Sequence, residues 1–101
     1  MESAKEKLSF AFDNSQLIKI IKTFTDEEDV QELGNSIVSK IMDGNEVECV
    51  QNYLFEKLGE LDIEVEYEDC SSLVSIMKEI YREDEAGGCV FYESIKSSIR
   101  N

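Results

Sequence analysis

The sequence contains no histidine and no proline, and only five of its 101 residues are glycine. Without histidine, the chain lacks the commonest general base, the usual partner of a nucleophilic serine or cysteine, and the commonest metal ligand. Without proline and with few glycines, its composition favours helices over a turn-rich β sandwich. The first absence argues against an enzyme, and the second argues for a mainly helical chain.

Motifs that hold metals, phosphates or cofactors are also missing. The three cysteines lie 21 and 19 residues apart, which is unlike the close pairs of zinc ligands. The carboxylates that follow Asp43 lack the register and the central glycine of a calcium-binding loop. Ser75 and Lys78 match the short S-x-x-K pattern, but its companion motifs are absent. We therefore expect no catalytic residues, no metal site and no cofactor.

Acidic residues far outnumber basic ones, and they are unevenly placed. The chain has 23 Asp and Glu against ten Lys and Arg, which gives a net charge of −13. Residues 25–85 hold nineteen acids and four bases, whereas both ends of the chain are slightly basic. A field of this sign repels nucleic acid and anionic membranes and attracts basic proteins. We expect a basic protein as the partner, without direct binding to nucleic acid or membrane.

The N-terminus and the cysteines bear on where the protein works. No apolar run at the N-terminus is long enough for a signal peptide or a membrane span. Three thiols, an odd number without the spacing of a disulfide framework, suit a reducing compartment. These features predict a cytoplasmic protein in which Cys49, Cys70 and Cys89 are small, mostly buried side chains.

Apolar residues recur at helical spacing along most of the chain. Their i, i+3, i+4, i+7 stripes predict helices at about 14–24, 26–42, 46–59 and 71–83. The second helix should begin with a capping box formed by Thr25 and Glu28, and it should end at Gly44. Gly59 is the expected end of the third helix, and residues 83–88 are expected to form a loop.

The two ends of the chain allow more than one interpretation. Residues 8–12 alternate as in a strand, although 3–12 also has a helical face. Residues 89–92 could begin a strand, but the spacing of the isoleucines favours a final helix. We predict one acidic helical domain, residues 1–101, folded as a mainly α, compact bundle of four to five short helices. An α+β fold, with a small β element of 8–12 beside 61–67, is the alternative.

The most unusual stretch is residues 60–69, which carries six carboxylates and no base. Its apolar residues Leu61, Ile63, Val65 and Tyr67 alternate with acids, which would place the two sets on opposite faces of an extended segment. Like charges held close together cost stability, so folding does not favour such a ladder. We therefore expect this stretch to be a docking edge for the partner.

Three acidic clusters are candidates for partner binding: the first turns of the second helix, residues 60–69, and residues 83–85. Acids at a helix N-terminus also stabilise the helix, and charge runs often serve only solubility. Residues 60–69 have the stronger case, because an aromatic residue within a charged patch is typical of an interface anchor. The predicted partner-binding residues are Glu60, Asp62, Glu64, Glu66, Tyr67, Glu68, Asp69, Asp26, Glu27 and Asp29.

Two functions would use such a surface. The first is that of an immunity protein or antitoxin, a non-catalytic inhibitor whose carboxylates cover the basic active site of a nuclease toxin. The second is that of a nucleic-acid mimic from a phage or mobile element, which would block a host defence or DNA-handling protein. We favour the first. An adaptor that binds through helix faces is a third possibility, and its binding would not depend on salt.

Overall fold

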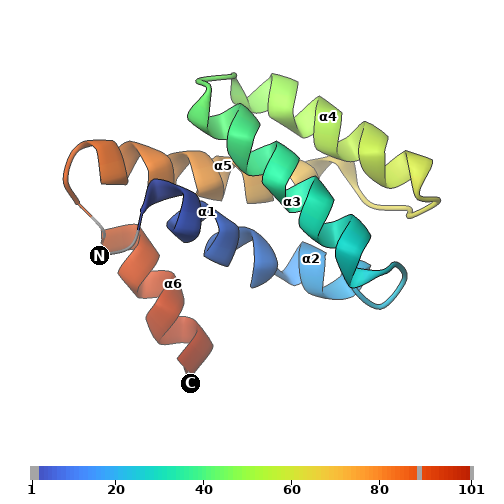
Figure 1. The fold of residues 1–101 in the computed structure, drawn as a ribbon, viewed down its shortest axis with the longest axis horizontal. Coiled ribbons are helices and arrows are strands. Elements are labelled where there is room, and N and C mark those ends of the chain that lie inside the picture. Colours follow the sequence, from blue (N-terminus) through green and yellow to red (C-terminus); the bar gives the residue numbers. More distant parts are fainter. Residues whose placement is uncertain (1–2, 89, 101) are drawn as a thin grey trace.

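The computed structural model describes residues 3–88 and 90–100, which form six helices joined by short connections (Figure 1). The described residues contain no strand, so the predicted mainly α fold is confirmed and the α+β alternative is wrong. Four to five helices were predicted, and the described residues form six because the N-terminal segment is also helical. The helices are α1 (Ala4–Asp13), α2 (Gln16–Ile21), α3 (Glu27–Met42), α4 (Val47–Glu60), α5 (Tyr67–Glu85) and α6 (Val90–Arg100).

α1 is a helix because its apolar side chains fill one helical face. Leu8, Ala11 and Phe12 are buried, at spacings of three and four residues along the chain. The Ser3 Oγ accepts a hydrogen bond from the Glu6 N–H at 3.2 Å and so caps the first turn. The strand-like alternation in this segment therefore does not correspond to a strand.

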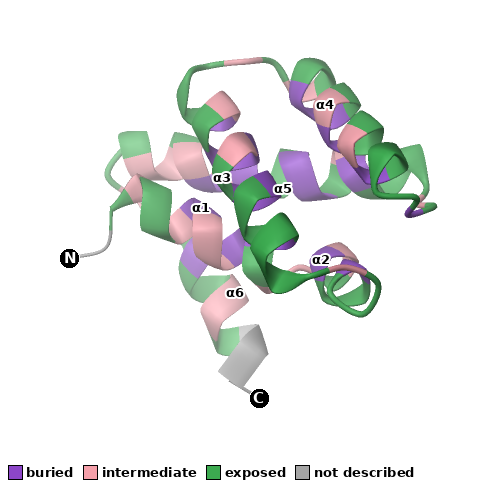
Figure 2. Ribbon diagram, turned by 45° about the vertical axis from the view of Figure 1, so that its right-hand side comes forward, coloured by how far each residue is buried: buried purple, intermediate pink, exposed green. Residues whose placement is uncertain are grey.

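α5 is the centre of the fold. Its 19 residues pack against each of the other five helices (Figure 1), and the helix is about 28 Å long. All six helices contribute to one hydrophobic core, in which Leu54, Met77 and Ile80 are among the largest buried side chains. Figure 2 shows buried residues on the sides of α3, α4 and α5 that face one another, and exposed residues on their outer sides.

α2 is much shorter than predicted. The Ser15 Oγ accepts a hydrogen bond from the Ile18 N–H at 3.3 Å and marks the start of the helix. Ile18 and Ile21 are buried, whereas Ile20 is 46 % exposed and Phe24 is 72 % exposed. The apolar stripe predicts that Ile20 and Phe24 lie in the core, and for these two residues the prediction is wrong. In so short a helix, Ile18 and Ile21 fill the face toward the core; Leu17 packs partly against the core, and Ile20 remains outside.

The predicted capping box of α3 is absent. The N-cap residue is Asp26, whose side chain makes no capping hydrogen bond. The Thr25 Oγ1 donates to the Asp29 Oδ2 at 3.4 Å, so it does not accept from the first turn as predicted with Glu28. Acids in the first turn still favour this end of the helix, because they face its positive terminus.

α3 and α4 end in the same hydrogen-bonded turn. At the end of α3, Gly44 has φ +88° and the next N–H donates to the Lys40 carbonyl at 3.2 Å. At the end of α4, Asp62 has φ +60° and the Ile63 N–H donates to the Leu58 carbonyl at 2.9 Å. Both arrangements are Schellman motifs. The predicted end of α3 is confirmed, whereas the glycine expected to end α4 lies inside its last turn.

α5 extends beyond its predicted bounds at both ends. It begins four residues earlier than expected, because Glu68 and Asp69 in its first turn face the positive end of the helix. It also continues through part of the predicted loop at 83–88, where the charged residues remain helical. The chain turns at Gly87, which has φ +83°.

α6 confirms the final helix and excludes a strand over Val90–Tyr92; Cys89, the first residue of that alternative, lies outside the described residues. Tyr92 is 3 % exposed, and its ring packs edge-on against the ring of Phe10 in α1, with ring centroids 5.6 Å apart. Of the other two cysteines, Cys70 is buried as predicted, and Cys49 is exposed, which corrects the prediction for that residue.

Candidate partner-binding surface

Residues 60–69 do not form one extended edge. α4 ends at Glu60, Asp62 turns the chain, and α5 begins at Tyr67, so only 61–66 lies outside helices. The prediction of one continuous extended segment over residues 60–69 is therefore wrong, because both ends of this stretch are helical. The alternation survives within the short connection, where two apolar side chains turn toward the core and the acids beside them are exposed.

Tyr67 fastens the start of α5 to α4. Its hydroxyl donates to the Asn52 side chain, and its carbonyl accepts a hydrogen bond from the Gln51 Nε2 at 3.1 Å. Its ring packs edge-on against Phe55, with ring centroids 5.2 Å apart. Both aromatic residues are 39 % exposed. The predicted interface anchor thus has a structural role, and it also presents a half-exposed aromatic edge to solvent.

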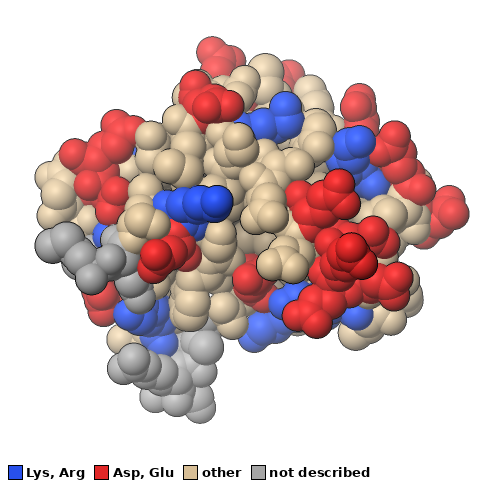
Figure 3. Space-filling model, in the orientation of Figure 1, with Lys and Arg blue, Asp and Glu red and all other residues tan. Residues whose placement is uncertain are grey.

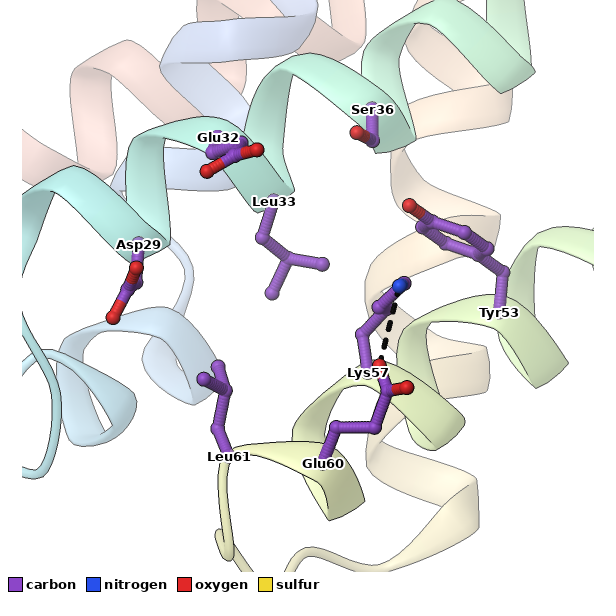
Figure 4. A pocket seen from close by; sticks show the side chains of 8 residues that line it. All are labelled: Asp29, Glu32, Leu33, Ser36, Tyr53, Lys57, Glu60 and Leu61. Atoms are coloured by element: carbon purple, nitrogen blue, oxygen red, sulfur yellow. Dashed lines mark ion pairs between the residues drawn. The ribbon is translucent and has the colours of Figure 1, made fainter.

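A cleft of about 230 Å³ lies between the N-terminal half of α3 and the C-terminal end of α4 (Figure 4). Carboxylates line it from both helices: Asp29 and Glu32 from α3, and Glu60 from α4. Leu33 and Leu61 point into the space between them (Figure 4). Folding therefore brings the first predicted cluster together with the beginning of the second.

One base, Lys57, also lines this cleft. Its Nζ lies 3.2 Å from a Glu60 carboxylate oxygen and 5.5 Å from the centre of the Tyr53 ring (Figure 4). The hydrogen bond and the charge of Glu60 raise the pKa of Lys57, and Tyr53 and Glu32 raise it further. Lys57 is therefore protonated at neutral pH. It offsets one of the three carboxylates and leaves the cleft with a net negative charge.

Acids from the start of α3 extend this cleft into a wider surface. Asp26, Glu27 and Asp29 are exposed, and among the described residues no base lies within ion-pair distance of them. Figure 3 shows acidic side chains gathered at the end of the molecule where α3 begins and α4 ends. We call this surface the acidic end; it consists of Asp26, Glu27, Asp29, Glu32 and Glu60.

Three other predicted residues, Glu64, Glu66 and Asp69, lie along an apolar groove. They line a hollow of about 600 Å³ between α2, the end of α4 and the start of α5. A second hollow, of about 480 Å³, continues along α5 and shares Leu17, Ile20 and Asp69 with the first. We call the two hollows together the α2–α5 groove. Its main apolar lining residues are Leu17, Ile20, Phe55, Ile63, Val65 and Ile76.

The third acidic cluster does not join the others. Residues 83–85 lie at the opposite end of α5 from its first turn, about 25 Å away (Figure 1). Asp84 accepts a hydrogen bond from the Lys7 Nζ at 2.7 Å, and this ion pair ties α1 to α5. At least one carboxylate of this cluster therefore has a structural role. The remaining two predicted residues, Asp62 and Glu68, are exposed.

Two parts of this surface depend on tertiary structure, and the sequence alone does not place them. Glu32 faces Glu60 only because α3 and α4 pack side by side, which periodicity within one helix does not reveal. The groove arises because Ile20 and Ile76 are left outside the core. The sequence does contain one indication of the groove: α2 has more apolar residues than one short helix can bury.

Among the described residues, no helix is both long enough and apolar enough to span a membrane. Within the same residues, no group of three or more His, Cys, Asp or Glu side chains converges as a metal site. No protein-family model matches the chain, and no curated protein or solved structure matches it either.

Proposed function

We propose that this protein is a non-catalytic acidic inhibitor, an immunity protein or antitoxin, that covers the basic active site of a nuclease toxin. The observation that supports this proposal is the acidic end, where carboxylates of α3 and α4 meet across a cleft. A nuclease binds substrate phosphates with Lys and Arg, and the carboxylates of an inhibitor can occupy the same positions. The net charge of −13 would also speed capture of a basic partner.

Folding alone does not explain these acids. Acids in the first turn of α3 stabilise that helix by about 0.3–1 kcal/mol each, but Glu32 lies beyond the first turn. Glu60 lies in the last turn of α4, at the negative end of the helix, where an acid is unfavourable. Its exposed ion pair with Lys57 is of a kind that contributes little to stability. Binding of a basic partner would account for the presence of acids at Glu32 and Glu60.

The direct test is protection. Purified ribonuclease and deoxyribonuclease toxin domains with basic active sites would be mixed with equimolar protein, and cleavage of a labelled substrate would be measured at low and high salt. We expect one of these domains to be inhibited, and added salt to weaken the inhibition because it screens the charges. Failure to inhibit any of them, or inhibition that salt leaves unchanged, would count against the proposal.

A matched pair of variants locates the surface. Asp29→Lys combined with Glu32→Lys reverses two charges of the acidic end, and Glu48→Lys combined with Glu93→Lys makes the same change in net charge elsewhere. Glu48 and Glu93 lie in the first turns of α4 and α6, so the control also loses favourable helix-terminus charge. We expect the first pair to abolish inhibition and the control pair to slow association only modestly. Equal effects would show that net charge, and not the acidic end, is responsible.

A further inference from the structure

The α2–α5 groove keeps large apolar side chains at the surface. Ile20 is 46 % exposed, Phe55 39 % and Ile76 37 %. Ile20 lines both hollows of the groove, Phe55 lines the one at the end of α4, and Ile76 lines the one along α5. Single exposed apolar residues are normal on a protein surface, whereas apolar residues gathered in a rimmed hollow mark interaction sites. The groove is therefore a candidate docking site in its own right.

The charged residues that line the groove are all acidic, which favours a positively charged occupant. Glu64, Glu66 and Asp69 line it, and the described lining residues include no Lys or Arg. None of the three carboxylates has an ion-pair partner among the described residues. A positively charged occupant would therefore gain three favourable contacts without breaking an existing pair. A second copy of this chain, with its own net charge of −13, would instead bring acids against acids.

The length of the groove indicates the kind of segment that fits. Along α5 the lining runs from Glu66, the N-cap residue, to Ile76, which corresponds to about 15 Å of helix. An amphipathic helix of about three turns has this length. Its apolar residues at i, i+3, i+4 and i+7 would fill the hollows, while Lys and Arg beside them would reach the rim.

We propose that the α2–α5 groove binds a basic amphipathic helix of about three turns, supplied by the partner. This inference rests on the proposed function, because it names the segment of a basic partner that the acidic end alone does not define. Charge then attracts the partner, and burial of apolar side chains in the groove holds it. Salt should therefore weaken capture more than it weakens the apolar contact.

Two peptide probes test the groove without the toxin. Both are fluorescein-labelled and contain Leu and Lys in the same proportions over about eleven residues; in one the leucines form a single helical face, and in the other they are dispersed. Fluorescence anisotropy would measure their affinities for the whole protein. We expect the one-faced peptide to bind about tenfold more tightly or better.

Variants assign the binding to the groove. Ile20→Ser combined with Ile76→Ser should remove most of the preference for the one-faced peptide and leave binding of the dispersed peptide unchanged. Val90→Ser, which removes a 78 % exposed side chain outside the groove, is the control and should change neither affinity. Glu64→Gln combined with Glu66→Gln should weaken both peptides. Circular dichroism would confirm that each variant is folded.

The possible outcomes separate the two proposals. Equal binding of both peptides by the unaltered protein would overturn the groove assignment and leave the electrostatic function standing. Strong preference for the one-faced peptide without inhibition of any nuclease would support the groove and count against toxin neutralisation. A preference that survives Ile20→Ser and Ile76→Ser would overturn the location. Self-association in analytical ultracentrifugation that the same two changes abolish would show that a second copy is the occupant.

Discussion

Replacing Gly34 by alanine is expected to destabilise the protein, although alanine is the better helix former. A Cβ at this position of α3 would lie 2.9 Å from two carbon atoms of the Phe12 ring, well inside their contact distance. Phe12 is 1 % exposed and packs in the core, so a shift of its ring would disturb the contacts with its buried neighbours. Overpacking costs about 1–3 kcal/mol, and removal of a helical glycine returns about 1 kcal/mol. The expected net loss is about 1 kcal/mol.

Gly59 supplies the matched control, because it lies in the last turn of α4 and an added Cβ would meet no atom within 4 Å. Gly59→Ala should raise the free energy of unfolding by about 0.5–1 kcal/mol. Urea titration followed by circular dichroism measures both variants. Phe12→Leu should convert Gly34→Ala into a stabilising change, because the smaller side chain makes room. If Gly34→Ala stabilised the unaltered protein, α1 and α3 would not pack this closely, and the reasoning would be refuted.

Four further predictions concern the helix caps, the reactivity of the thiols, alkaline unfolding and association at acid pH. Ser15→Ala should cost about 1 kcal/mol because it removes a cap, whereas Thr25→Ala should cost less than about 0.5 kcal/mol, as urea titration would show. In a Cys89→Ser background, Ellman's reagent should label Cys49 in the folded protein and Cys70 only after unfolding. Burial, and then the nearby carboxylate of Asp69, raise the pKa of the Cys70 thiol from 9.0 to about 11. The contribution of this neutral thiol to stability is therefore complete below pH 9.0 and is lost as the pH rises through about 11. The free energy of unfolding of Cys70→Ala should fall less over the same pH range. Near the isoelectric point of about 4.2 the net charge approaches zero and whole molecules no longer repel one another, so light scattering should show association that Ile20→Ser reduces.

Much of the helical framework could be predicted from periodicity. α3 and α4 have long apolar stripes, and Gly44 marks the end of the first, so local sequence and tertiary packing agree there. The prediction fails where local signals compete. Thr25 has the chemistry of a cap but lies one residue too early, and the charged residues at 83–85 suit an exposed helical turn as well as a loop.

The surface could be predicted only in part. The acids at 26–29 are exposed as expected, but the alternating stretch is divided between a helix end, a turn and a helix start. Strict alternation indicates a strand only if a neighbouring strand satisfies its backbone, and the described residues contain none. The cleft and the groove depend on which helices are neighbours. That information lies in the packing of Leu54, Met77 and the rest of the core and not in any single segment.

α3 and α4 close with the same turn, once with Gly44 and once with Asp62. Glycine adopts this conformation without steric cost, whereas aspartate is disfavoured there by its backbone and by its charge at a negative helix end. A library of every residue at position 62 could be sorted once for folded protein and once for partner capture. Glycine should be enriched by the first sort, and aspartate by the second if this corner contacts the partner. Position 62 is thus a place where selection for binding can be measured separately from selection for folding.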